Sequence, residues 1–201
     1  MPRIETLLRD SLPHGQNRGL QSTDRQIRHR EGSHQNRLKR WGTKLGDHGY
    51  FPLYLALSVV CGWFVAARGR SGEAFPWLTA LAVLSVGYAL EGVLLGALKP
   101  WLDFPRPLLA LPAGSVHVIG HAEFRHSLPS GHSAFAMLIA ASLWPQANLP
   151  ARLGLLVFAL WVGLSRISLG AHFPADVVAG FILSLMIVWL LRALAKRLST
   201  N

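Results

Sequence analysis

Residues 165–176, SRISLGAHFPAD, place an arginine, a histidine and an aspartate between two strongly apolar segments. Asp176 follows His172 by four residues, and Pro174 lies between them. Proline suits the first turn of a helix, so we expect a helix to begin near Phe173, with His172 at its mouth. A carboxylate one turn inside can hold one imidazole nitrogen and leave the other free to react. The alternative is a histidine and an aspartate that cap a helix in an interfacial loop.

The composition indicates an integral membrane protein. Of the 201 residues, 51% are hydrophobic and 15% are charged, and the mean hydropathy is +0.31. This is too apolar for an ordinary soluble domain. Cys61 is the single cysteine, so no disulfide can form within the chain. The N-terminus is polar and lacks the apolar core that a signal peptide needs.

Basic residues are concentrated before the first apolar segment. The formal net charge is +10, and residues 1–48 hold ten Lys and Arg against five Asp and Glu. Basic residues that flank apolar spans are expected to contact anionic lipid headgroups. Nucleic-acid binding is not expected, because the tail lacks interleaved aromatic residues and a recognisable fold. We therefore expect a basic, polar tail over residues 1–48, disordered or interfacial, and a transmembrane domain over residues 49–201.

Five apolar segments predict an all-α fold: an integral membrane helical bundle of about five transmembrane helices with a long active-site loop. They cover about residues 50–67, 75–98, 132–144, 153–169 and 175–194. A helix needs about 20 mainly apolar residues to cross a bilayer, and the third and fourth segments reach this length only with their polar ends. Because charge inside lipid is costly, those polar ends must lie near a membrane face or a wet cavity.

The alternation of spans brings the polar residues to one membrane face. The second span ends at Lys99, a loop over roughly residues 100–128 leads to the third, and the fourth ends near His172, where the fifth begins. In an alternating bundle these points share one face. The residues expected to meet there are Lys99, Arg106, Ser130, His132, Arg166, His172 and Asp176.

Three cations, two histidines and an aspartate at one face indicate a phosphate site. Arginine offers paired donors that match phosphate oxygens, and lysine adds a point charge. Ser130, Gly131 and His132 precede an apolar helix, whose free N–H groups also favour a phosphate. His172 can then attack phosphorus as a neutral imidazole. His132 can donate a proton to the leaving oxygen and later activate water.

A metal site is the competing interpretation of two histidines and a carboxylate. Three cations beside a metal ion would be unfavourable, and the sequence has no cluster of Asp and Glu suited to magnesium. We therefore expect no metal and no cofactor.

Three ordered motifs span residues 99–176. Lys99 is followed after six residues by Arg106-Pro107, then come Pro129-Ser130-Gly131-His132 and Ser165-Arg166, with five residues to His172 and three more to Asp176. This pattern resembles the signature of the type-2 phosphatidic acid phosphatase family, whose superfamily includes vanadium-dependent haloperoxidases and acid phosphatases. The resemblance implies a metal-independent phosphatase with a phosphohistidine intermediate and a helical core over about residues 50–195.

The same resemblance assigns roles to single residues. His172 would be the nucleophile, Asp176 its orienting partner, and His132 the acid and base. The phosphate binders that it implies are Lys99, Arg106, Ser130, Gly131 and Arg166.

Membrane members of this family commonly have six spans, whereas this sequence shows five, with a basic tail where the first would be. In bacterial relatives the site usually faces the periplasm or outside, which would place the tail outside too, against the positive-inside tendency. The Arg68–Arg70 loop, Arg152 and the basic C-terminal end fit the inside in that arrangement. An outward site with an interfacial tail and an inward site both remain. We expect the first, in a bacterial inner membrane.

The loop over residues 107–128 is too long for a plain connector. We expect a lid or interfacial helix that admits a lipid phosphate sideways, with Arg125 contacting a second phosphate or a headgroup. The alternative is that its side chains rest in the interface. Glu91 is expected to pair structurally with a cation or polar group in the bundle. Gly92 and Gly96 are spaced for close helix contact.

The expected function is hydrolysis of a lipid phosphate or diphosphate at the bilayer. Candidate substrates are phosphatidate, phosphatidylglycerophosphate, undecaprenyl diphosphate and lipid A phosphate, because the motifs bind phosphate and are silent on the lipid tail. One alternative is a phosphotransferase that passes the phosphoryl group to a lipid hydroxyl. Another is a non-enzymatic transporter or scaffold with a relic site. The sequence leaves the oligomeric state open.

Overall fold

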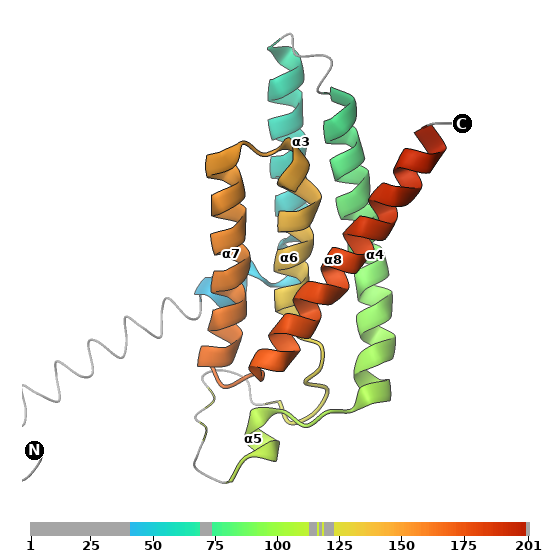
Figure 1. Cartoon of the computed structure of the whole chain (residues 1–201). Coiled ribbons are helices and arrows are strands. Elements are labelled where there is room, and N and C mark those ends of the chain that lie inside the picture. The colour runs from blue at the N-terminus through green and yellow to red at the C-terminus, as the bar shows by residue number, and fades with distance from the viewer. Residues whose placement is uncertain (1–40, 69–73, 113–115, 117, 119–122, 200–201) are drawn as a thin grey trace, which may run out of the picture. The chain divides into compact units, whose positions relative to one another are not determined.

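The computed structural model describes residues 41–68, 74–112, 116, 118 and 123–199. Residues 1–40, which form most of the predicted tail, lie outside the described residues, as do several positions of the predicted lid. Throughout the described ranges every regular element is helical, which confirms the all-α fold (Figure 1). A short helical segment covers residues 41–45, before the first labelled element. In chain order the elements are η1 (His48–Tyr50), α3 (Phe51–Ala67), α4 (Ala74–Leu102), α5 (Pro107–Ala110), α6 (Gly131–Leu143), η3 (Trp144–Gln146), α7 (Leu149–Ser168) and α8 (Pro174–Ser199).

Four helices, α3, α4, α7 and α8, are long and apolar enough to cross a membrane. Large apolar side chains such as Val93, Met186 and Trp189 are exposed on the bundle surface, as expected of helices that face lipid. The predicted third span is the 13-residue α6, which is too short to cross a bilayer alone. It packs against α4, α7 and α8 and buries Phe135 and Leu138 completely. The protein is therefore a membrane bundle built around a short central helix.

Gly180 lets α8 approach the start of α6. A Cβ atom at this position would lie 2.6 Å from the Ser130 carbonyl oxygen and 3.1 Å from the Ala134 backbone nitrogen. Only a residue without a side chain fits against this backbone. The contact places the first turn of α8, which carries Asp176, directly beside the N-terminus of α6.

The expected close contact at Gly92 and Gly96 is wrong for contacts within the described chain. A Cβ atom at either glycine of α4 would meet nothing within 4 Å. The spacing of the two glycines predicts a helix face that lacks side chains, but it does not predict whether that face meets another helix.

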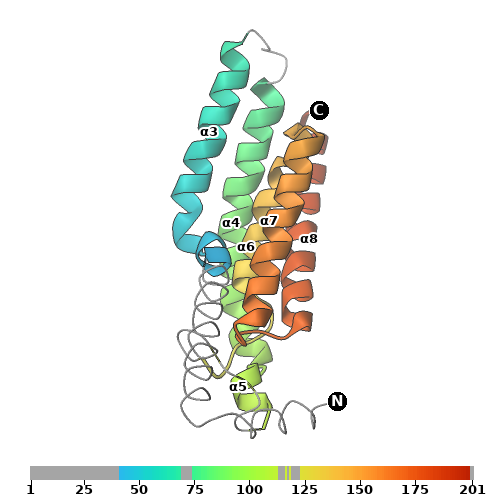
Figure 2. The ribbon, with the colours of Figure 1, turned by 90° about the vertical axis from the view of Figure 1, so that its left-hand side faces the viewer.

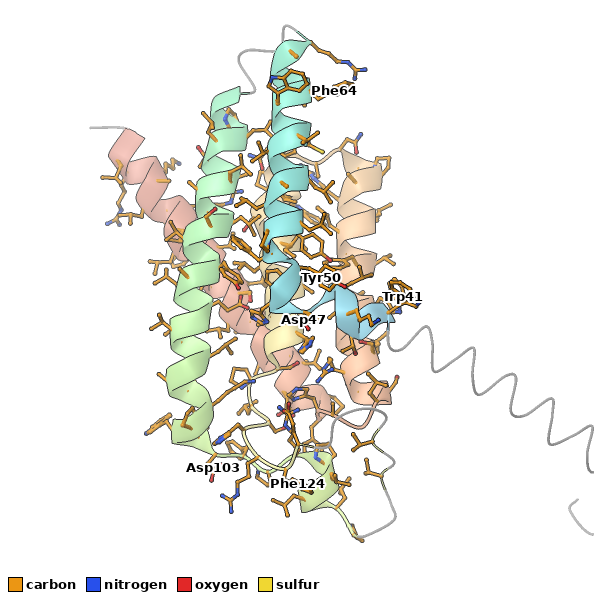
Figure 3. All side chains as sticks on the ribbon, turned by 180° about the vertical axis from the view of Figure 1, so that it is seen from behind. Trp41, Asp47, Tyr50, Phe64, Asp103 and Phe124 are labelled. Atoms are coloured by element: carbon orange, nitrogen blue, oxygen red, sulfur yellow. The ribbon has the colours of Figure 1, made fainter. Side chains whose placement is uncertain are left out.

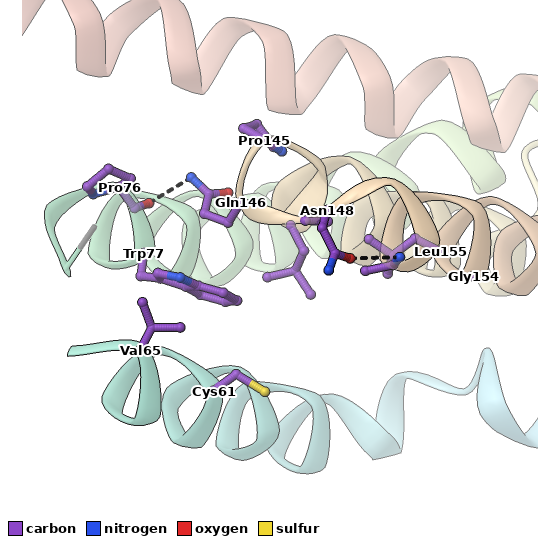
Figure 4. Close-up of a pocket in the computed structure, with 12 residues that line it drawn as sticks. Cys61, Val65, Pro76, Trp77, Pro145, Gln146, Asn148, Gly154 and Leu155 are labelled. Carbon is purple, nitrogen blue, oxygen red and sulfur yellow. Dashed lines mark hydrogen bonds between the residues drawn. The ribbon is translucent and has the colours of Figure 1, made fainter. Parts of the chain in front are cut away.

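One end of the bundle gathers four helix termini. The ends of α4 and α7 and the beginnings of α6 and α8 lie there beside α5, as the alternation of spans predicts (Figures 1 and 2). A separate cavity of about 880 Å³ lies at the opposite end, between α3, α4 and the beginning of α7 (Figure 4). There Gln146 donates a hydrogen bond to the Pro76 carbonyl at 2.9 Å, and Asn148 caps α7. None of the predicted site residues is among those that line it.

Candidate active site

His172 lies in the short connection between α7 and α8. Gly170 adopts φ 68°, a left-handed conformation that glycine accepts without strain, and α8 then begins at Pro174, one residue after the predicted start. His172 is only 3% exposed. Its Nδ1 atom lies 3.4 Å from Oδ2 of Asp176. The predicted carboxylate–imidazole pair is therefore present at the mouth of a helix.

Two further donors fix the Asp176 carboxylate. Oδ2 accepts the Phe173 backbone N–H at 2.8 Å and the Ser127 hydroxyl at 2.5 Å. The Asp176 carbonyl also accepts the Ser130 N–H at 2.9 Å. Asp176 thus joins three segments: the His172 connection, the end of the long loop and the N-cap of α6.

Arg106 faces the other nitrogen of His172. Its Nη1 lies 3.3 Å from His172 Nε2 and 3.2 Å from the Ala171 carbonyl oxygen, while Nε donates to the Arg125 carbonyl at 3.1 Å. A guanidinium can only donate, so Nε2 must accept with its lone pair. The proton of the neutral ring then lies on Nδ1, toward Asp176. This tautomer directs the reactive lone pair of His172 at a cation.

The environment favours the neutral form of His172. Burial lowers the pKa of His172 below its ordinary value, and the charges of Arg106 and Arg166 lower it further. The hydrogen bond with Asp176 opposes these effects. The net lowering of the pKa leaves the imidazole unprotonated, and so nucleophilic, near neutral pH.

The other predicted phosphate binders surround this pair. Lys99 Nζ lies 3.8 Å from the point that a Cβ of Gly131 would occupy. Ser130 caps α6, and its hydroxyl lies 2.9 Å from that of Ser133. Arg166 reaches Thr43 Oγ1 at 3.3 Å, and its buried Nε has no hydrogen-bond partner in the described part of the chain. An unpaired buried donor beside other cations is an opening for an anionic ligand.

His132 occupies the first turn of α6 and is close enough to Arg166, His172 and Lys99 for electrostatic interaction. Arg125 differs from the other predicted residues. Its side chain is 63% exposed and pairs with Asp103 at the rim, so it lies at the mouth of the site rather than among the buried groups. Figure 3 shows Asp103 and Phe124 at this end of the bundle.

A cavity of about 550 Å³ opens at this rim and reaches Lys99 and Arg106. Its remaining lining comes from the end of α4 and from Glu123, Phe124, Arg125 and His126. Glu123 forms an ion pair with Nη2 of the buried Arg106. A carboxylate therefore occupies a guanidinium edge that matches a phosphate in charge and geometry.

The family model described as the PAP2 superfamily matches residues 80–199. The chain belongs to the PAP2 superfamily. The matched residues include all three motifs and the whole of α6, α7 and α8.

Relatives of this PAP2 chain include membrane lipid phosphatases. A lipid A 1-phosphatase of Rhizobium etli is 41% identical over 64 residues, which cover 30% of this chain and 25% of that protein. Aquifex aeolicus LpxE shares the fold with a TM-score of 0.60 and 26% identity, over 79% of this chain and 85% of that chain. A PAP2-type phosphatidylglycerolphosphate phosphatase from Bacillus subtilis gives 0.57 and 26%, over 81% and 77%. The chain thus spans about a quarter of the curated relative's length but most of the two solved structures.

Sequence reasoning missed three residues that the PAP2 fold brings into this site. Thr43 contacts Arg166, Glu123 pairs with Arg106, and Ser127 bonds Asp176. Ser127 stands three residues before Ser130 in an irregular loop, where no periodicity marks it. Among the described residues, no three His, Cys, Asp or Glu side chains are grouped closely enough to hold a metal ion.

Replacing Ser127 by alanine should lower kcat for phosphate release about tenfold, because a lost outer hydrogen bond loosens the carboxylate that orients His172. KM should change little, since the side-chain hydroxyl of Ser127 lies within hydrogen-bonding distance of Asp176 and His172, which orient and carry out the attack. The matched control is Ser142→Ala, which removes another fully buried serine hydroxyl that has no hydrogen-bond partner among the described residues. Equal kcat values for the two variants would contradict the role given to Ser127.

Proposed function

We propose that this PAP2 protein is a metal-independent phosphatase that hydrolyses a lipid phosphate or diphosphate through a phosphohistidine. One observation carries the proposal: Nδ1 of His172 lies 3.4 Å from the Asp176 carboxylate, and Nε2 faces the guanidinium of Arg106. A nucleophile aimed at a cation suits an anionic electrophile. The membrane phosphatases among the relatives support the same reaction.

In the first step, Nε2 of His172 forms a bond to phosphorus as the bond to the leaving oxygen breaks. His132 donates a proton to that oxygen. Lys99, Arg106 and Arg166 stabilise the charge on the remaining phosphoryl oxygens. Asp176 stabilises the positive charge that develops on the ring of His172.

In the second step, His132, now unprotonated, takes a proton from water, and the water oxygen attacks phosphorus. The bond between phosphorus and Nε2 breaks, and inorganic phosphate leaves. Glu123 is displaced from Arg106 while phosphate is bound and can return after release, because both anions compete for the same guanidinium edge.

A lipid substrate suits the position of this site. The cavity that reaches Lys99 and Arg106 is lined by Leu95 and Phe124 as well as by polar groups. It lies at the end of the span α4. A substrate that stays in the bilayer can present its headgroup there while its chains remain in lipid. The lipid A 1-phosphatase and the phosphatidylglycerolphosphate phosphatase are the relatives that support this class.

The deciding experiment is phosphate release by the purified protein from a panel of lipid phosphates, assayed in EDTA. The panel should hold phosphatidate, phosphatidylglycerophosphate, undecaprenyl diphosphate, a lipid A phosphate and one water-soluble phosphate ester. We expect release from at least one lipid at undiminished rate in EDTA. A requirement for added metal would contradict the metal-free mechanism, and transfer to a lipid alcohol without phosphate release would identify a phosphotransferase.

We further propose that the site faces the periplasm or outside of a bacterial inner membrane. The C-terminus is at the opposite end of α8 from Asp176 (Figure 1), and Lys196 and Arg197 near it fit the inside. A green fluorescent protein fused after Asn201 should therefore fluoresce, because it folds in the cytoplasm. A dark fusion of normal abundance, combined with an active fusion to a periplasmic reporter, would place the site inside.

A further inference from the structure

A second carboxylate–imidazole pair lies close to the first. His48 opens η1, and its Nε2 is 3.6 Å from Oε1 of Glu91 on α4. Glu91 is completely buried. Its Oε2 lies 2.9 Å from the Ser184 hydroxyl, which has one proton and is also within reach of the Ala134 and Gly180 carbonyls. Oε1 has no hydrogen-bond partner in the described chain. Because a buried carboxylate needs compensation, this one depends on His48.

The fold holds the ring of His48 in a fixed place. Asp47 caps η1 by accepting the Gly49 N–H at 2.8 Å. The imidazole stacks on Phe135 of α6, with 4.9 Å between ring centroids and 22° between planes. About a third of the side chain stays exposed. His48 is therefore positioned from three sides and keeps one edge open.

The ring of His48 borders the candidate active site. The point that a Cβ of Gly131 would occupy is 3.3 Å from Cε1 of His48 and 3.8 Å from Nζ of Lys99. The His48 and His132 rings meet edge to face, with 6.4 Å between centroids. Gly131 thus leaves room for two nitrogen-bearing side chains beside the residue that protonates the leaving oxygen. Among the described residues, the charged group that pairs with His48 is Glu91.

We propose that His48 and Lys99 form an anion subsite on the leaving-group side of the scissile bond, with Lys99 shared between this subsite and the transferred phosphoryl group, and that the substrate is a lipid diphosphate whose inner phosphate binds there. This inference rests on the proposed function. In-line transfer places the leaving oxygen opposite the attacking nitrogen of His172, on the side of His132. His48 lies next to His132, where the group beyond that oxygen would extend.

Cleavage of a diphosphate releases a charged leaving group, and the subsite would bind it. Nε2 of His172 bonds to the terminal phosphorus, and the bond from that phosphorus to the bridging oxygen breaks. The bridging oxygen keeps the electron pair and receives the proton of His132. The leaving group is a lipid monophosphate, whose charge meets the ammonium group of Lys99 and an N–H of His48, the imidazole that pairs with Glu91. A monophosphate ester would release a neutral alcohol, which gains nothing from these groups.

The test compares two substrates with the same polyprenyl tail, one diphosphate and one monophosphate, on the full-length purified protein. His48→Ala should lower kcat/KM for the diphosphate by at least about tenfold, the size expected for a charge-assisted hydrogen bond, and for the monophosphate by less than about threefold. Glu91→Gln, which keeps the size of the side chain, should also lower kcat/KM more for the diphosphate than for the monophosphate. Tyr50→Phe, at the exposed end of η1, is the control and should change neither rate.

Equal losses on both substrates would mean that His48 only supports the fold, and the subsite would be wrong. An unchanged rate on the diphosphate, or a wild-type protein that hydrolyses only the monophosphate, would also overturn it while leaving the lipid phosphatase proposal intact. A wild-type protein inactive on both lipids and on the wider panel would instead remove the proposed function itself. If His48→Ala does not fold, Glu91→Gln decides by the same comparison.

Discussion

Replacing His172 by asparagine should lower kcat for phosphate release by at least about a thousandfold, the scale seen when a nucleophile is removed from a catalytic unit. Asparagine keeps a polar side chain but has no nitrogen lone pair to attack phosphorus. The variant should still fold, because His172 is in a connection and Asp176 retains the Phe173 and Ser127 donors. The measurement is phosphate release, together with trapping of an acid-labile, base-stable phosphoryl label on the wild-type protein.

The pH profile provides a second readout of the same residue. Since burial lowers the pKa of His172, its neutral form should persist below the ordinary histidine range, and the acid limb of kcat/KM should fall there. The Asp176 hydrogen bond favours the protonated ring and so raises this pKa. Asp176→Asn should therefore move the acid limb to still lower pH while reducing kcat. If the His172→Asn variant kept a tenth of the wild-type activity, or still acquired the acid-labile phosphoryl label, the mechanism would be contradicted.

The convergence of the site could be predicted because it follows from topology and chemistry together. Spans that alternate in direction must return their ends to two faces, so polar residues at successive ends meet. His172, Asp176 and Arg106 lie within hydrogen-bonding distance for this reason, although 66 residues separate Arg106 from His172. The proline at position 174 marked the start of α8 because its ring favours the first helical turn.

The site residues that the sequence did not predict depend on the direction of their side chains, which the order of residues along the chain does not encode. Glu123 and Ser127 lie in an irregular loop, so nothing in their spacing indicates which way they point. Glu91 was expected to pair with a polar or cationic group, and it faces His48, which the sequence assigned to the tail. The length of α6 was also hidden, because a short helix in the centre of a bundle and a full span are equally apolar.

Glycine spacing likewise does not predict which way a helix face points. Gly92 and Gly96 form the recognisable motif, yet a Cβ there would meet no described atom within 4 Å. Gly180 belongs to no motif, yet its missing side chain allows the backbones of α6 and α8 to touch.

Gly180→Ala should destabilise the fold by about 1–3 kcal/mol, the cost typical of overpacking, and the rigid backbone opposite it favours the upper part of that range. The variant should also lose most of its activity, because α8 must move away from α6.

The loss of activity follows from what α8 carries. Asp176 is one turn before Gly180, and its carbonyl accepts the Ser130 N–H at 2.9 Å. An outward shift of α8 breaks this bond and draws the carboxylate away from His172 and Ser127. Thermal unfolding in detergent and phosphate release measure the two effects separately. Gly92→Ala is the matched control: it adds the same methyl group to another membrane helix at an open position, so stability and activity should stay at wild-type levels. If both variants behaved alike, the close contact between α8 and α6 would not be what positions Asp176, and the orientation of His172 would have to depend on the loop alone.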